Sequence, residues 1–297
     1  MARQEALVPV PQNPDQFAFL SQHGMVRAEE GNRQAETIKT SLIQGLGFFG
    51  NDSDVVAIHQ NTNSGPTGQA RLERFRIYSR AVEEKCGGNA NIKHAWYGAS
   101  KGEICEILSH GFSRTTQREE DGYGSGVCLY PVDFPINAAL SSKADESGLR
   151  HLLICRVILG NMEEICRGSE QHEPSSEHFD SGVDNLLAPR RYIIWSSHMN
   201  SHILPYYIIS FRAPNLRGLE TIQTDAQVPT LPCMDIPALM LKLSNFLPRS
   251  STVLIEKYHA EFQQNRIAKV QLIGKMKQLA GDHLLSALIK LINEEKV

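Results

Sequence analysis

Two apolar segments that run into glycines constrain the fold of this chain most. The first is His94–Ser100 (HAWYGAS), and the second, further along, is Gly122–Tyr130 (GYGSGVCLY). A glycine within a strand marks a place where a ligand or another backbone approaches closely. The two segments therefore predict two strands that border one cleft.

The sequence around these segments mixes strand and helix patterns. Runs of branched apolar residues at Leu149–Gly160, Tyr192–Trp195 and Tyr206–Phe211 predict buried strands. Ser100 and Glu103 have the Ser-x-x-Glu spacing of a capping box, so a helix is expected to begin there. Strands interspersed with few helices predict an α+β domain.

The pattern changes at the C-terminal end. Apolar residues there repeat at helical spacing in four runs, which begin near Asp235, Ser250 or Ser251, Arg266 and Asp282. Four short amphipathic helices indicate a small all-α bundle. From Asp235 onward nine Lys/Arg stand against six Asp/Glu, so this part carries +3 while the whole chain carries −3.

The domain boundaries follow from these shifts. Residues 1–36 hold three prolines and little periodicity, which predicts a loose leader. The α+β domain is expected over 37–214. A stretch with Gly and Pro at 215–234 predicts a linker, and the helical domain follows at 235–297.

Composition excludes several classes of protein. With 41% hydrophobic and 21% charged residues the chain is expected to be globular. Its six cysteines lack the spacing of a zinc site, so we expect reduced core thiols and no metal. The sequence lacks a secretory signal pattern and a run of the roughly 20 apolar residues that a membrane span needs, so an intracellular protein is expected. Gly45–Gly50 matches G-x-G-x-x-G but leads into a turn and a strand, which disfavours a dinucleotide loop.

Taken together, Trp96–Gly98 and the Gly-x-Gly-Val-x-Leu strand at Gly124–Leu129 resemble the nicotinamide pocket of poly(ADP-ribose) polymerase-type ADP-ribosyltransferases. With Met199–Ile203 and the helices over Met234–Asn293, the order of parts resembles the plant "similar to radical-induced cell death one" family. The resemblance implies the short form of these proteins, without the N-terminal WWE domain. The resemblance implies a polymerase-like transferase fold joined to a four-helix RST domain.

The resemblance also implies a degenerate site. In such transferases a histidine holds a ribose, a tyrosine stacks on nicotinamide, and a glutamate favours the oxocarbenium-like transition state. These positions fall here on Tyr97, on Cys128, and on Asn200 or alternatively Arg191. A further aromatic would fall on Ala139 or Leu140. The cofactor-binding positions are Gly98, Ser100 and Gly126.

Because losing one group that acts in the transition state costs about 10² to 10³ in rate, three changes predict weak or absent NAD⁺ binding and no robust transferase activity. Two alternatives stay open. One is an active mono-ADP-ribosyltransferase with a non-standard triad, and the other is a sensor that binds NAD⁺ or ADP-ribose without turnover.

The RST domains of the family bind disordered segments of transcription factors. This implies a nuclear scaffold in stress and developmental responses, without direct contact to nucleic acid or membranes and with homo- or hetero-oligomers left open. The expected partners are acidic amphipathic segments that fold into a groove. The residues expected to contact them are Leu239, Leu243, Leu254, Tyr258, Leu285 and Leu288.

Overall fold

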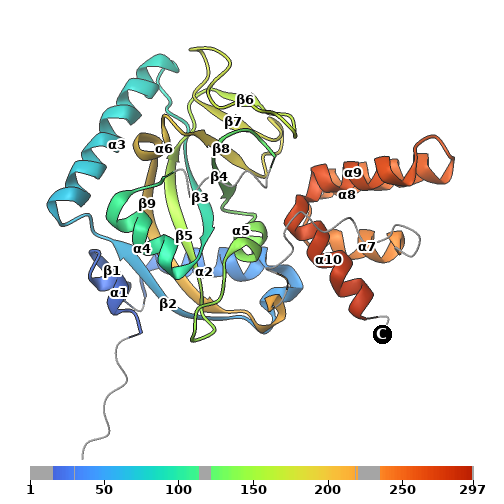
Figure 1. The fold of residues 1–297 in the computed structure, drawn as a ribbon, viewed down its shortest axis with the longest axis horizontal. Coiled ribbons are helices and arrows are strands. Elements are labelled where there is room, and N and C mark those ends of the chain that lie inside the picture. The colour runs from blue at the N-terminus through green and yellow to red at the C-terminus, as the bar shows by residue number, and fades with distance from the viewer. Residues whose placement is uncertain (1–15, 30, 114–121, 218, 220–234, 296–297) are drawn as a thin grey trace, which may run out of the picture.

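The computed structural model describes residues 16–29, 31–113, 122–217, 219 and 235–295 (Figure 1). Its strands form one nine-stranded sheet in the order β1-β2-β9-β5-β3-β4-β8-β7-β6. Their bounds are β1 Met25–Arg27, β2 Asp54–Asn61, β3 Ile92–Ala99, β4 Gly126–Pro131, β5 Arg150–Ile158, β6 Met162–Glu164, β7 Ser181–Val183, β8 Tyr192–Trp195 and β9 Ile203–Arg212. All neighbouring strands run antiparallel except β6 and β7.

The helices of the α+β domain pack around the sheet, and the C-terminal helices lie to one side of it. Those of the α+β domain are α1 Ala18–Ser21, α2 Arg33–Gly45, α3 Pro66–Lys85, α4 Lys101–His110, α5 Ile136–Ser141 and α6 Met199–His202, with the 3-10 turns η1 Gly47–Gly50 and η4 Pro214–Leu216. The Ser100 side chain accepts a hydrogen bond from the Glu103 N–H, and the Glu103 carboxylate accepts one from the Ser100 N–H. The predicted capping box of α4 is therefore confirmed.

The two faces of the sheet have different cores. Side chains alternate along β3, so Ala95 and Tyr97 pack with α1 and α4, whereas Trp96 packs with α2 and α5 on the opposite face. Helix α3 packs separately, with Phe75 and Val82 against Ile158 and its neighbours.

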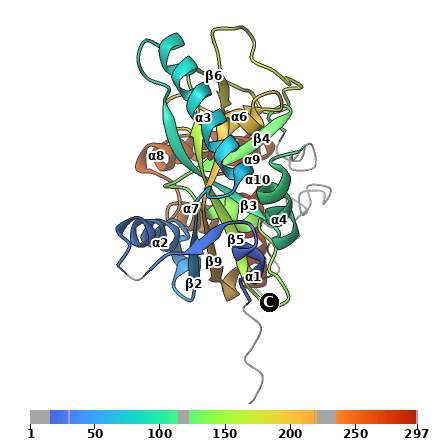
Figure 2. The ribbon, with the colours of Figure 1, turned by 90° about the vertical axis from the view of Figure 1, so that its left-hand side faces the viewer.

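The C-terminal bundle consists of α7 Ile236–Leu243, α8 Arg249–Gln263, α9 Lys269–Ala280 and α10 Asp282–Glu294. The Asp235 carboxylate caps α7 by accepting a hydrogen bond from the Ala238 N–H at 3.0 Å. The four predicted helices and the predicted α+β fold with a helical end are confirmed. The bundle lies on the side of the sheet that α2 and α5 cover (Figure 1, Figure 2), and one hydrophobic cluster runs through both parts.

The glycines of Gly45–Gly50 permit close packing there. A Cβ on Gly45 would lie 2.2 Å from Cδ of Pro135, and one on Gly47 would lie 2.8 Å from the Phe246 ring of the bundle. Gly47 also has φ +55°, a conformation that favours glycine. This segment forms η1 and leads into β2, as expected for a chain without a dinucleotide loop at this position.

The predicted loose leader over residues 1–36 is wrong for the part that the structure describes. Phe17, Leu20 and Met25 are buried, β1 pairs with β2, and α2 already begins at Arg33. The two elements before α2, helix α1 and strand β1, are four and three residues long. They are too short to show a helical or strand period in the sequence. Outside the described residues lie residues 1–15 and 30, together with 218 and 220–234 of the predicted linker.

No helix in the described ranges is long and apolar enough to cross a membrane.

Candidate functional site

The sheet forks between β3 and β4. These strands pair only at Ala95 with Pro131 and at Trp96 with Tyr130. Beyond that point β3 continues along β5 to Ala99, while β4 continues along β8. The two glycine segments thus form the two sides of the fork, where the sequence predicted a cleft.

Helix α5 packs on the sheet face at Gly98. A Cβ on Gly98 would lie 1.9 Å from the carbonyl oxygen and 2.8 Å from the carbonyl carbon of Ala138. Ala138 and Ala139 have the smallest side chains after glycine and are fully buried, so the helix packs directly on the strand. The face of Gly98 toward α5 therefore has no room for a side chain.

Tyr97 connects β3 to α4. Its side chain is 3% exposed, and its hydroxyl donates a hydrogen bond to Oε1 of Glu103 at 2.6 Å. Its ring meets Phe112 edge-on, with the ring centroids 5.3 Å apart. The residue in the place of the expected histidine therefore serves the packing of α4.

Cys128 lies on the other face of the sheet. It is partly buried and packs against a cluster that contains Tyr123, Ile193 and Trp195. A thiol has no π-face with which to stack on a nicotinamide ring. Tyr97 and Cys128 thus belong to two separate hydrophobic clusters.

The two alternatives for the third position lie in different surroundings. Arg191 is buried, with its guanidinium 4.3 Å from the Tyr123 ring centroid and its Nε 3.9 Å from Oδ2 of Asp184. Burial raises the pKa of Asp184 although Arg191 acts in the opposite direction. Asn200 instead accepts a hydrogen bond from the N–H of Phe112 and donates one to its carbonyl, both at 2.8 Å.

Asn200 and Tyr97 therefore meet around Phe112, whereas Arg191 and Cys128 both pack with the Tyr123 side. Neither third position supplies a carboxylate. Neither Asn200 nor Arg191 could therefore stabilise positive charge on a ribose in the way the resemblance describes.

The remaining predicted cofactor positions have structural roles. The hydroxyl of Ser100 caps α4 at 3.2 Å from the Glu103 nitrogen. A Cβ on Gly126 would lie 2.7 Å from the carbonyl oxygen of Ile194, so this glycine lets β4 and β8 pack closely. The structure describes no group of three or more His, Cys, Asp or Glu that could hold a metal ion.

Most of the predicted partner-binding residues form the core of the bundle, which corrects that prediction. The residues no more than 2% exposed are Leu239, Leu243, Leu285 and Leu288. Helical spacing identifies the faces that pack on one another, so it selected core positions. Leu254 is 39% exposed, and the partly buried Tyr258 ring carries the Lys275 ammonium 4.4 Å from its centroid.

A small groove between α7 and α8 was missed by the sequence reasoning. Its volume is about 230 Å³, and Met240, Leu241 and Ile255 line it together with polar residues. Leu241 is 72% exposed. An apolar residue off the main stripe of a short helix was the only sequence signal for it.

The corner between α9 and α10 rests against the α+β domain beside the fork. A Cβ on Gly281 would lie 2.9 Å from Nδ2 of Asn137 and 3.2 Å from Nη2 of Arg191. Next to it, the Asp282 carboxylate accepts two hydrogen bonds from the Arg167 guanidinium, one of them at 2.6 Å. The bundle thus covers the side of the fork on which Cys128 lies. Only the helix start at Asp282 could be predicted from the sequence.

Known proteins match the chain over both parts. A family model described as the RCD1-SRO-TAF4 (RST) plant domain matches residues 228–294. An Arabidopsis thaliana protein named probable inactive poly(ADP-ribose) polymerase SRO2 is 43% identical over 275 residues, which cover 91% of this chain and 84% of the relative. Another from the same plant, probable inactive poly(ADP-ribose) polymerase SRO5, is 34% identical and covers 92% and 86%.

A solved structure agrees with these matches. The crystal structure of the PARP domain of Arabidopsis RADICAL-INDUCED CELL DEATH1 superimposes with a TM-score of 0.55 at 29% sequence identity. The superposition covers 60% of this chain and 97% of that domain. The expected polymerase-like fold and the expected position of the RST domain are confirmed.

Proposed function

Because this chain belongs to the plant SRO family of poly(ADP-ribose) polymerase-like proteins, we propose that it is a scaffold without transferase activity. Its helical domain binds disordered acidic segments of transcription factors. This binding takes place in the nucleus, in stress and developmental responses. The names of the relatives support the first part, and the RST domain supports a role in protein interaction.

The side chains at the triad positions carry the proposal of an inactive site. Asn200 and Arg191, the two candidates for the third position, both lack a carboxylate. Cys128 offers no π-face for stacking, and the Tyr97 hydroxyl is already bonded to Glu103. Stabilisation of the oxocarbenium-like transition state is therefore impaired.

A labelled-NAD⁺ assay tests this part. We expect the purified full-length protein to transfer no label to itself or to added protein, and to give no binding heat in an NAD⁺ titration. An active polymerase in parallel checks the assay. Sustained transfer would reject the scaffold, and heat without product would favour a sensor instead.

The outer surface of the bundle supports a peptide-binding role. Leu241, Val253 and Leu254 are exposed on α7 and α8, and the groove between these helices offers an apolar slot. The +3 charge of the segment from Asp235 onward favours acidic partners. An amphipathic segment that folds on binding would present an apolar face to such a groove.

Matched surface variants test the binding role. Fluorescent acidic activation segments from plant transcription factors are titrated into the full-length protein. Leu241→Glu places a like charge in the groove and should weaken binding by roughly tenfold or more. Val270→Glu, at a residue 65% exposed that does not line the groove, should bind as the wild type does. Equal loss in both variants, or no loss in either, contradicts the groove.

A further inference from the structure

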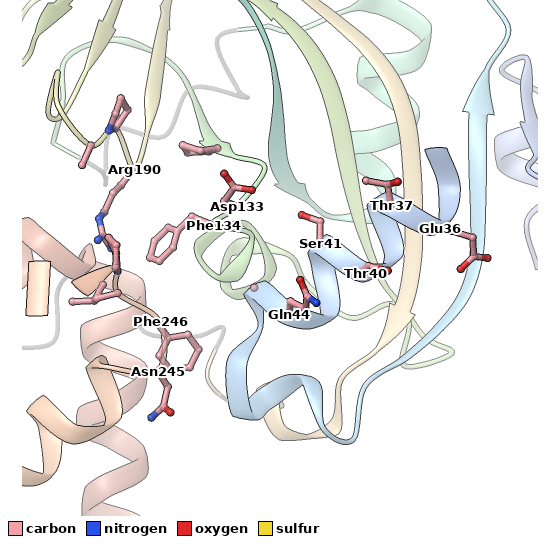
Figure 3. A pocket seen from close by; sticks show the side chains of 16 residues that line it. Glu36, Thr37, Thr40, Ser41, Gln44, Asp133, Phe134, Arg190, Asn245 and Phe246 are labelled. Atoms are coloured by element: carbon pink, nitrogen blue, oxygen red, sulfur yellow. The ribbon is translucent and has the colours of Figure 1, made fainter. Parts of the chain in front are cut away.

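A second cavity lies between the two parts of the molecule. Its volume is about 870 Å³. Figure 3 shows residues of α2 along one wall, Phe134 and Arg190 at one end, and Phe246 of the bundle beside them. The walls thus come from α2, from the segments that follow β4 and precede β8, and from the turn between α7 and α8.

Arg190 is the only Arg or Lys that lines this cavity among the described residues. It is 8% exposed, its Nη2 donates to Oγ of Ser251 at 3.0 Å, and its guanidinium stands 4.8 Å from the Phe134 ring centroid. Its Nη1 is buried and has no hydrogen-bond partner within the described part of the chain. Burial lowers the pKa of Arg190 to about 10, so the group remains charged at neutral pH.

No carboxylate in the described ranges forms an ion pair with Arg190. The nearby Asp184 uses Oδ1 to accept the backbone N–H groups of Arg190 and Arg191, and its Oδ2 faces the Arg191 guanidinium. Asp184 thus acts on the Arg190 charge without a hydrogen bond to its guanidinium, and an unmade hydrogen bond of a buried charged group is costly. Such a group is stabilised when a ligand brings the missing oxygen.

The wall opposite suits an extended chain. Thr37, Ser41 and Gln44 follow one another at i, i+4 and i+7 on α2 and line the cavity. Seven residues of helix rise about 10 Å, roughly the length of three extended residues. Glu36 and Asp133 also line the cavity, which disfavours a phosphate or a run of acidic residues.

From these observations we propose that the cavity binds a peptide segment of a partner protein that carries one Asp or Glu beside an aromatic or aliphatic residue. The carboxylate pairs with the guanidinium of Arg190, and the apolar side chain packs against Phe134 and Phe246. Both parts of the molecule contribute, so the occupied site holds them together. This site is separate from the groove between α7 and α8.

A display experiment tests the proposal. Random heptapeptides are selected on the full-length protein and then compared on Arg190→Gln and on Arg80→Gln, an exposed residue of α3. We expect enriched peptides to share one acid next to an apolar residue and to bind Arg190→Gln roughly tenfold more weakly, with Arg80→Gln unchanged. Absence of enriched peptides, absence of the acid, or equal binding to Arg190→Gln overturns the proposal.

Two further variants keep the result clear. Thr40→Trp fills the cavity from an exposed position on α2 and should abolish the same peptides even if Arg190→Gln folds poorly. Leu241→Glu should leave them bound. Peptides lost in Leu241→Glu but kept in Arg190→Gln occupy the groove, and they would support the proposed function while counting against the cavity.

Discussion

At the scale of single residues, the side chains at the positions of the expected triad make contacts within the fold. Tyr97 donates to Glu103, Asn200 bonds both the N–H and the carbonyl of Phe112, and Cys128 packs in a small apolar cluster. Each change therefore carries a structural role, and restoring one residue would not restore a transferase.

Tyr97→His tests this view. Imidazole is too short to reach the Glu103 carboxylate in the same way, so the free energy of unfolding should fall by about 1–2 kcal/mol. No transfer from labelled NAD⁺ should appear. Tyr97→Phe is the control that removes only the hydroxyl, with a loss of about 1 kcal/mol in urea denaturation. A variant as stable as the wild type, or one with activity, contradicts the expectation.

His202 gives the stability a pH dependence. It is 2% exposed, and its ring stacks on His198 with the centroids 4.7 Å apart. Burial, with His198 as the next cause, lowers the pKa of His202 from 6.5 to about 4. The unfolded chain thus takes up a proton near pH 6.5 and the folded one only near pH 4, so stability falls as the pH drops through this window, by up to about 3 kcal/mol.

Urea denaturation at pH 7 and at pH 5 measures this effect. His202→Gln should lose much of the difference between the two pH values, because its amide does not titrate. His110→Gln, at an exposed position at the end of α4, should keep the wild-type difference. An undiminished difference in His202→Gln would assign it to other groups.

The identity of the fork residues could be predicted from the sequence, because the glycines of His94–Ser100 and Gly122–Tyr130 fix the register. Their contacts could not. Phe112, which Tyr97 and Asn200 share, follows α4, and its position depends on how that helix returns to the sheet. Likewise, no pattern in the sequence around Arg190 indicates that its guanidinium is buried with a nitrogen that lacks a hydrogen bond.

At the scale of elements, helix α5 packs tightly on the face of β3 at Gly98. The short distance between α5 and Gly98 follows from two alanines on the helix and from the absence of a Cβ on the strand. Regular spacing predicted α7 to α10 well, since each repeats an apolar stripe. The same stripe identified core residues and gave no information on the exposed Leu241.

Gly98→Ala should therefore be strongly destabilising. The new methyl would overlap the Ala138 carbonyl, so α5 must move, at a cost of about 1–3 kcal/mol or more. Gly102→Ala is the matched control within α4, where a Cβ meets nothing within 4 Å and helix propensity improves by up to about 1 kcal/mol. Thermal melting of both variants decides the point, and an unchanged melting temperature in Gly98→Ala would show that α5 is free to yield.

At the scale of the whole molecule, the bundle packs against the α+β domain. Phe246 of the bundle meets Phe48 and Phe49 of η1, with ring centroids 5.2 and 5.8 Å apart. Asp282 adds the ion pair with Arg167. The α+β domain therefore covers part of the bundle and limits where a partner can bind it. Binding is for this reason best measured on the full-length chain.

Calorimetry of Asp282→Asn tests this coupling. We expect one unfolding transition for the wild type and, in the variant, a loss of about 1–2 kcal/mol as the partly exposed Arg167 loses its charged partner. Glu294→Gln, exposed at the end of α10, should change little. Two separate transitions already in the wild type would refute the coupling.

The fork also provides its own optical probe. Trp96 and Trp195 are the only two tryptophans of the chain, and they stand on opposite sides of the point where β3 and β4 part. Both are fully buried, and the indole of Trp96 donates to the Val132 carbonyl at 2.8 Å. Separation of β3 from β4 would break the hydrogen bond between Trp96 and Val132, expose the Trp96 ring to water and shift its emission to longer wavelength. Opening of the fork can therefore be followed by fluorescence without a label.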